Sequence, residues 1–144
     1  MTGTRSSTPR EIARELVAQE IAGADEPAAV GAALQRVCTR VADNLRRAVG
    51  DDGYNALMAR ALMRTQADHP VLLDIRRVGK SDIYLDGVVQ SVNTRGAAPV
   101  RAAIEAIIAA IADVLAGLIG ADMVLNLLTD RRSQDRAVRP GQES

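Results

Sequence analysis

The feature that most constrains the fold is a pattern that recurs after seventy residues. Residues 48–58 read AVGDDGYNALM and residues 118–128 read LIGADMVLNLL. In both stretches a Gly is followed two positions later by Asp and then by Leu, and both follow a long amphipathic stretch. The apolar stripes align at the same offset: Val30, Leu34, Val37, Val41, Leu45 and Val49 match Val100, Ile104, Ile107, Ile111, Leu115 and Ile119, and Leu118 also belongs to the second stripe. We interpret the chain as two copies of one unit, a long helix, a Gly-Xaa-Asp corner and a second helix.

A simpler alternative is that any two Ala-rich amphipathic helices share such a stripe. That alternative explains the stripe but accounts less easily for the matching Gly, Asp and Leu beyond it. Gly50 and Gly120 allow a left-handed helix end, and Asp52 and Asp122 can cap the helices that follow. The prediction is an all-α fold, a four- to five-helix bundle with pseudo-twofold symmetry. Its repeat units span 27–66 and 97–130 and its apolar stripes are buried, with residues 71–96 as the connector.

A further helix is predicted ahead of the first unit. In the sequence TPRE, Thr8 is a suitable N-cap, Pro9 suits the first helical position, and Glu11 can complete a capping box. This helix should end near Gly23 and act as a cover for the bundle. Residues 8–130 therefore form one helical domain, whereas the polar segments 1–7 and 131–144 are expected to be disordered.

The connector contains the strongest hairpin signal in the chain. In IYLDGVVQ, Asp86-Gly87 joins two short β-favouring runs, which predicts a hairpin over 83–90. The alternative for this stretch is an irregular connection followed by a short helix from Asp86.

Composition excludes some functions. Apolar residues make up 47% of the chain and aromatic residues 1%, and the formal net charge is zero. The bulk charge therefore gives no basic excess for nucleic acid, and aromatic stacking platforms for single strands are lacking. A single Cys and the absence of an apolar leader are consistent with a cytoplasmic protein. The many Ala and Arg residues suggest a GC-rich bacterial genome.

The two copies differ on one face. Arg36, Arg40 and Arg47 of the first copy become small residues in the second, where only Glu105 and Asp113 are charged. A helix with large apolar residues on one side and small ones on the other is usually covered on both sides. It can lie at the centre of its own bundle or pack on a second copy, and we expect the latter. The candidate dimer face is Ala102, Ala106, Ala109, Asp113 and Ala116. A membrane span over 102–121 is disfavoured because both acidic residues lie inside it.

No catalytic, metal or cofactor site can be assembled from the sequence. His69 precedes Pro70 and is expected to end a helix, and Cys38 is expected to be a small buried residue. Glu105 and Asp113 flank one side of a helix, but no Glu-Xaa-Xaa-His is present for a di-iron bundle. The stretch GDDG lacks the alternating ligands of a calcium loop.

The leading hypothesis is a non-catalytic interaction or regulatory module that acts as a homodimer and also contacts another protein. Two alternatives are a DNA-binding regulator that uses Arg36, Arg40, Arg46 and Arg47, and an enzyme or carrier with an aliphatic cavity near Glu105 or Asp113. The connector is a natural recognition surface because it joins the two packed units. The candidate partner contacts are Arg36, Arg40, Arg47, Arg76, Arg77 and Tyr84.

Overall fold

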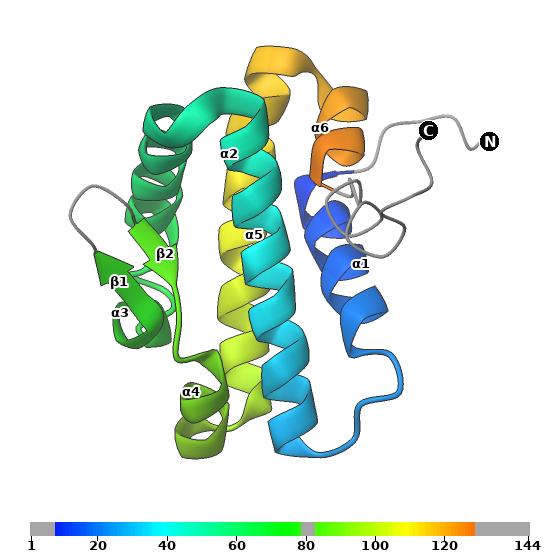
Figure 1. Cartoon of the computed structure of the whole chain (residues 1–144), viewed down its shortest axis with the longest axis vertical. Coiled ribbons are helices and arrows are strands. Elements are labelled where there is room, and N and C mark those ends of the chain that lie inside the picture. The colour runs from blue at the N-terminus through cyan, green and yellow to red at the C-terminus, as the bar shows by residue number, and fades with distance from the viewer. Residues whose placement is uncertain (1–7, 79–82, 129–144) are drawn as a thin grey trace, which may run out of the picture.

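The computed structural model describes residues 8–78 and 83–128, and this part of the chain is mostly helical (Figure 1). The all-α prediction is confirmed at this level. The helices are α1 (Pro9–Ile21), α2 (Pro27–Thr65), α3 (Val71–Ile75), α4 (Val88–Arg95), α5 (Ala97–Ile119) and α6 (Ala121–Leu128). Two short strands, β1 (Arg76–Val78) and β2 (Ile83–Leu85), pair in antiparallel fashion.

Helix α5 lies at the centre of the molecule. It contacts α1, α2, α3, α4 and α6. The first arm of α2 runs beside α5 in the same direction, so both helices reach their glycine bends at the same end of the molecule (Figure 1). Helix α1 packs mainly against α5 and α4 packs mainly against α2. Thus α1, which precedes α2 in the chain, covers α5, and α4, which precedes α5, covers α2.

Both bends occur at a glycine. Gly50, inside α2, has φ 81° and ψ 172°, and Gly120, between α5 and α6, has φ 89° and ψ 153°. Only glycine adopts this region readily, which explains why the chain has Gly at both positions. Helix α6 begins at Ala121, and the Gly120 carbonyl accepts its first bond from the Val124 N–H at 3.1 Å, so Gly120 is at the N-cap position; the Asp122 side chain lies outside the described part.

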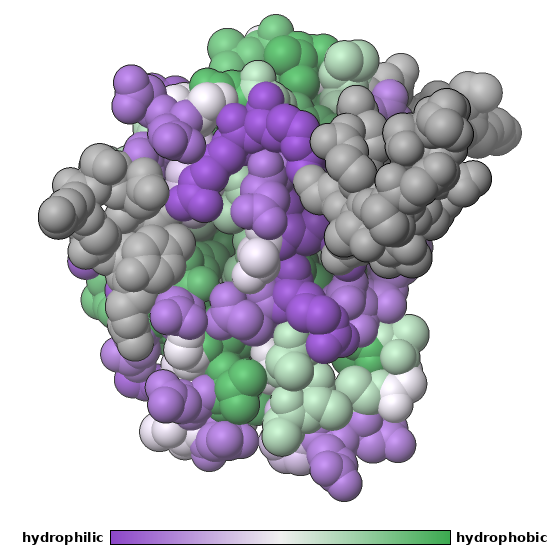
Figure 2. Space-filling view, in the orientation of Figure 1, coloured by the Kyte–Doolittle hydropathy of each residue, from purple (hydrophilic) through white to green (hydrophobic). Residues whose placement is uncertain are grey.

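Not all of the predicted apolar stripe is buried. Leu118 is 73% exposed, and Val49 and Ile119 are each 40% exposed. Their expected burial is wrong because the two long helices extend beyond the point where the described helices pack across them. Figure 2 shows the resulting hydrophobic patch at the end of the molecule where α5 passes into α6.

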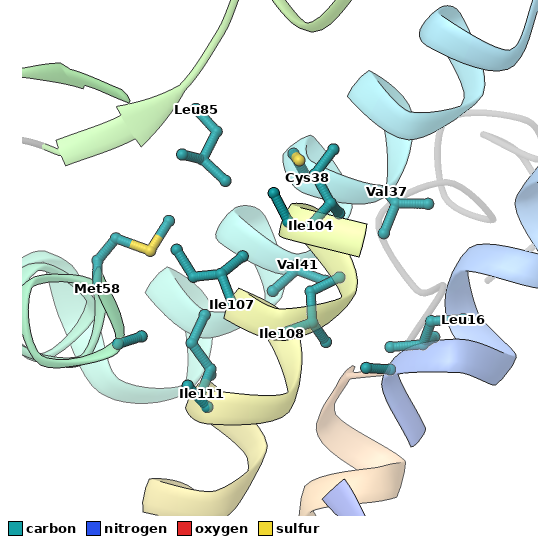
Figure 3. Close-up of a cluster of buried hydrophobic side chains, with 14 of the residues drawn as sticks. Leu16, Val37, Cys38, Val41, Met58, Leu85, Ile104, Ile107, Ile108 and Ile111 are labelled. Atoms are coloured by element: carbon teal, nitrogen blue, oxygen red, sulfur yellow. The ribbon is translucent and has the colours of Figure 1, made fainter. Parts of the chain in front are cut away.

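The remainder of the stripe forms an aliphatic core around α5. Ile104, Ile107 and Ile111 are almost completely buried and face Val41 and neighbouring residues of α2 (Figure 3). The helices approach closely where α4 crosses α2. There, a Cβ on Gly31 would lie 2.9 Å from the Cα of Val89. This crossing requires a residue without a side chain.

The start of the first helix is as predicted. The Glu11 N–H donates to Thr8 Oγ1 at 3.1 Å, and the Thr8 N–H donates to Glu11 Oε1 at 3.0 Å. These two bonds form the capping box and satisfy backbone donors at the N-terminus of α1.

The connector holds a strand pair, but its turn is elsewhere than predicted. Strand β2 pairs with β1, the strand that precedes it in the chain. Asp86-Gly87 therefore leads into α4 instead of forming a hairpin turn. Residues 79–82, which join the strands, lie outside the described part. The Asp86 N–H donates to the Ile75 carbonyl at 2.8 Å, which extends the pairing up to the start of α4. The alternative prediction, an irregular connection followed by a short helix from Asp86, is right only in its helix, because α4 begins at Val88 but the connection contains the strand pair.

The predicted disorder of 1–7 and 131–144 concerns segments outside the described residues.

Candidate functional site

A surface groove of about 770 Å³ runs along one face of α5. Its floor consists of small residues of α5, its first wall is the N-terminal part of α1, and its second wall is the end of α2 with the turn that follows. The lining residues include Arg10, Arg14, Arg64, Ala106, Ala109 and Asp113. The groove is therefore shallow and unreactive at its base and charged along its sides.

Ion pairs organise the charged sides of the groove. Arg64 Nη2 lies 2.9 Å from Asp113 Oδ2, which links the end of α2 to α5. Arg101 Nε lies 2.9 Å from Glu105 Oε2 one turn further down α5. The side chains of Arg64 and Asp113 are about half exposed, so this pair is accessible to a partner and contributes little to stability.

The candidate dimer face coincides with this floor. Ala102, Ala106, Ala109 and Asp113 line the groove, and Ala116 is half-buried on the same helix. Ala102 and Asp113 are exposed, whereas Ala106 and Ala109 are half-buried. Helix α5 therefore lies at the centre of its own fold and leaves one strip of small residues open to solvent.

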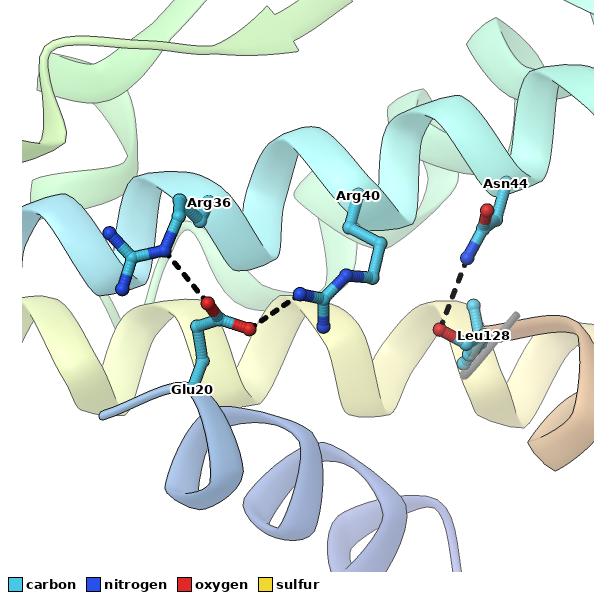
Figure 4. A network of polar contacts seen from close by, with 5 residues as sticks. All are labelled: Glu20, Arg36, Arg40, Asn44 and Leu128. Atoms are coloured by element: carbon cyan, nitrogen blue, oxygen red, sulfur yellow. Dashed lines mark hydrogen bonds and ion pairs between the residues drawn. The ribbon is translucent and has the colours of Figure 1, made fainter. Parts of the chain in front are cut away.

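The arginine face of α2 is largely neutralised by α1. Arg36 Nε lies 2.8 Å from Glu20 Oε2, and Arg40 Nη2 lies 2.6 Å from Glu20 Oε1 (Figure 4). The Arg40 side chain is only 9% exposed. Burial raises the pKa of Glu20, but the hydrogen bonds and charges of the two arginines outweigh it and leave that pKa below its ordinary value. Arg36 and Arg40 therefore serve to fasten α1 to α2.

Sequence reasoning missed Glu20. It lies 16 and 20 residues from its two partners, whereas local rules on helices detect pairs three or four residues apart. A usable signal would have been an acidic residue at the end of a covering helix opposite the arginine stripe of α2.

The other predicted contacts lie in two places, Arg47 near the bend of α2 and the remaining three in the strand pair. Arg47 is exposed near the Gly50 bend, where its Nη1 donates to Asn44 Oδ1 at 3.4 Å. Arg76 is half-buried in β1. Arg77 and Tyr84 are opposite each other in the strand pair, but their side chains lie outside the described part. The structure does not bring these candidates and the arginines of α2 into one surface patch among the described residues.

The chemically reactive residues are also dispersed. His69 lies on the groove wall, and its backbone N–H donates to the Thr65 carbonyl at 3.0 Å. Cys38 is buried in the core, and burial raises its pKa to about 12. Among the described residues, no three His, Cys, Asp or Glu side chains form a group that could hold a metal ion. The groove is lined by Ala and by polar and charged residues, whereas the aliphatic-cavity alternative requires a lining of Ile and Leu.

Helix α5 is the one described helix that is long and apolar enough to cross a membrane. Most of its large apolar residues, among them Ile104, Ile107 and Ile111, are buried against the other helices, whereas Leu118 and Ile119 at its end are exposed. Comparisons of the chain with protein families, with curated protein sequences and with solved structures gave no match.

Proposed function

We propose that this protein is a non-catalytic interaction module that binds a helix of a partner protein in the groove along α5. The observation that carries the proposal is the strip of small residues between two charged walls. A floor of alanines lets another helix approach α5 closely, and the walls supply charges that select its orientation.

The dimensions of the groove suit a short helix. The floor extends from Ala102 to Asp113, which is about 16 Å at the rise of an α-helix. This length accommodates about three turns of a partner helix. Arg10, Arg14 and Arg64 provide positive charge, and Glu105, Asp113 and Asp68 provide negative charge. The expected ligand therefore carries small apolar residues on one face and both signs of charge on its flanks.

The same floor is the candidate dimer face, and self-association through it remains a prediction. The flanking walls favour a single inserted helix, because α1 and the end of α2 hold the floors of two facing copies apart.

We also infer that the chain contains two copies of one bent helical unit. In support of this, α2 begins at Pro27 and α5 at Ala97, seventy residues later, and each bends after the same number of residues, at Gly50 and Gly120. In this scheme the second copy has exchanged arginines for small residues and so supplies the groove floor.

A photo-cross-linking amino acid at position 106 tests the docking site in the cells that make the protein. The matched control carries it at Thr39, which is exposed on α2 and does not line the groove. The proposal expects one defined partner to be captured from position 106 and not from position 39. A helical peptide from that partner should bind the purified protein, and Ala109→Arg should abolish binding while the circular dichroism spectrum is unchanged. Equal capture from both positions, or binding that survives Ala109→Arg, would contradict the proposal.

A further inference from the structure

The charged residues that line the α5 groove differ in whether the chain already neutralises them. Arg64 forms an ion pair with Asp113, and Glu105 forms an ion pair with Arg101 on its own helix. A charge that is offset by a close neighbour has little attraction left for a bound partner. Within residues 8–78 and 83–128, the lining charges that have no ion pair or hydrogen bond of their own are Arg10, Arg14 and Asp68.

The α1 wall presents two of these charges in a regular arrangement. Arg10 and Arg14 are exposed and both line the groove, and their spacing of four residues places them one turn apart on the same face of α1. The acidic residues beside them in the sequence, Glu11 and Glu15, do not line the groove. Each of these carboxylates instead accepts a hydrogen bond at 3.0 Å from a residue of α1 or its cap. The α1 wall is therefore positively charged on the side that faces the groove.

The opposite wall has the other sign. Its unpaired charge among the described residues is Asp68, which is exposed in the turn after α2. Helix α1 and the second arm of α2 lie on either side of α5 (Figure 1), so the two unlike walls flank one floor of alanines. Charges placed in this way act mainly on the choice of partner and on its register, because charged residues of the wrong sign are repelled.

We propose that the helix bound in the groove carries two carboxylates one turn apart on the flank that faces α1, where they pair with Arg10 and Arg14. A Glu-Xaa-Xaa-Xaa-Glu spacing in the partner reproduces the spacing of the two arginines. The other flank, which faces Asp68, carries a basic or a neutral residue. The partner is thus a helix with a face of small residues and one acidic flank. This inference rests on the proposed function, because it requires that a helix occupies the groove.

Selection from a library of displayed helical peptides tests the proposal. The peptides share a face of alanines and vary among Glu, Gln and Lys at the flanking positions, all of which favour helix. Peptides that bind the wild type but not Ala109→Arg are groove binders. Among these we expect enrichment of two Glu residues one turn apart on one flank. The double variant Arg10→Glu with Arg14→Glu should instead select Lys at the same two positions.

Affinities of a selected Glu peptide provide the matched control. Arg14→Glu should weaken its binding by about tenfold, because an attraction becomes a repulsion. Arg60→Glu makes the same change of charge at an exposed position of α2 that does not line the groove, and it should leave binding unchanged. About 0.5 M NaCl should remove most of the preference for Glu over Gln in the unmutated protein, since salt screens exposed charges. Circular dichroism should show the same helical content in all variants.

The outcomes separate this inference from the proposed function. Groove binders without a preference for Glu, or equal losses in Arg14→Glu and Arg60→Glu, would overturn the acidic flank and leave the groove as a site for a helix. A preference for Glu that persists unchanged at high salt would also overturn it. A library that yields no peptide sensitive to Ala109→Arg would overturn both the acidic flank and the proposed function.

Discussion

Gly50 and Gly120, seventy residues apart, share one backbone conformation: a positive φ, 81° and 89°, combined with a nearly extended ψ, 172° and 153°. No side chain lies within 4 Å of a Cβ built at either position. At both bends, therefore, glycine is required by the backbone conformation and not by close packing.

Replacing either glycine by alanine should destabilise the protein. Gly50→Ala and Gly120→Ala force a side chain into a backbone region that nearly only glycine adopts, and each should lower the free energy of unfolding by about 1–3 kcal/mol. Urea denaturation followed by circular dichroism measures this change. Gly117→Ala is the control, because Gly117 is exposed within α5 with nothing near its added Cβ. It should stabilise the protein by about 0.5–1 kcal/mol. If all three variants changed stability equally, the backbone argument would be wrong.

Gly31→Ala should destabilise the protein for a different reason. Within a helix this change is normally favourable, but here the new methyl group would lie 2.9 Å from the backbone of Val89. Helix α4 must move away from α2, at a cost of about 1–3 kcal/mol. Hydrogen exchange should detect the effect as lost protection in α4 before it is lost in α5. An increase in stability like that expected for Gly117→Ala would show that α4 does not pack so closely.

The local features of the fold could be predicted from sequence. The capping box of Thr8 and Glu11 and the two glycine bends depend on residues within a few positions of one another, so local rules suffice. The predicted hairpin turn at Asp86-Gly87 is wrong because β2 pairs with β1, which precedes it in the chain. That choice depends on a tertiary contact, which a turn signal does not contain.

The candidate site was predictable only in part. The small residues on one face of α5 can be read from the sequence, and Ala102, Ala106 and Ala109 among them line the groove. The walls of the groove could not be predicted, since they depend on where α1 and the end of α2 pack. The exposure of Leu118 was missed for a similar reason: periodicity identifies the apolar stripe but does not reveal where the covering helices end.

Glu20→Gln should loosen α1. The change removes the carboxylate charge that faces Arg36 and Arg40, and the nearly buried Arg40 then loses its ion pair. We expect a loss of about 1–3 kcal/mol in the free energy of unfolding. Arg40→Gln should cost more than Arg36→Gln, because Arg36 is 55% exposed and can be solvated without its partner. Equal effects of the two arginine variants would contradict the burial of Arg40 and the exposure of Arg36.

The contribution of Glu20 should depend on pH. Because its pKa is lowered in the folded protein, the ionised carboxylate is stabilised by folding. This stabilisation is present at and above the pH at which glutamate ionises in the unfolded chain, and it is lost as the pH falls through the lowered pKa of the folded state. The stability difference between the wild type and Glu20→Gln should therefore be large at pH 7 and shrink toward pH 3. A difference that is constant from pH 7 to pH 3 would exclude the carboxylate charge as its source.

Cys38 should react with thiol reagents only when the protein opens. Cys38, on the buried face of α2, is 8% exposed, and its pKa of about 12 leaves almost no thiolate at pH 8. Labelling of the native protein with an aromatic disulfide reagent at pH 8 should therefore be slow and should reach one thiol per chain at once in urea. Gly31→Ala should accelerate native-state labelling in proportion to its loss of stability if the reaction requires global unfolding, because reactivity then follows the population of the open state. Rapid labelling of the folded wild type would mean that Cys38 is not buried in the core in this way.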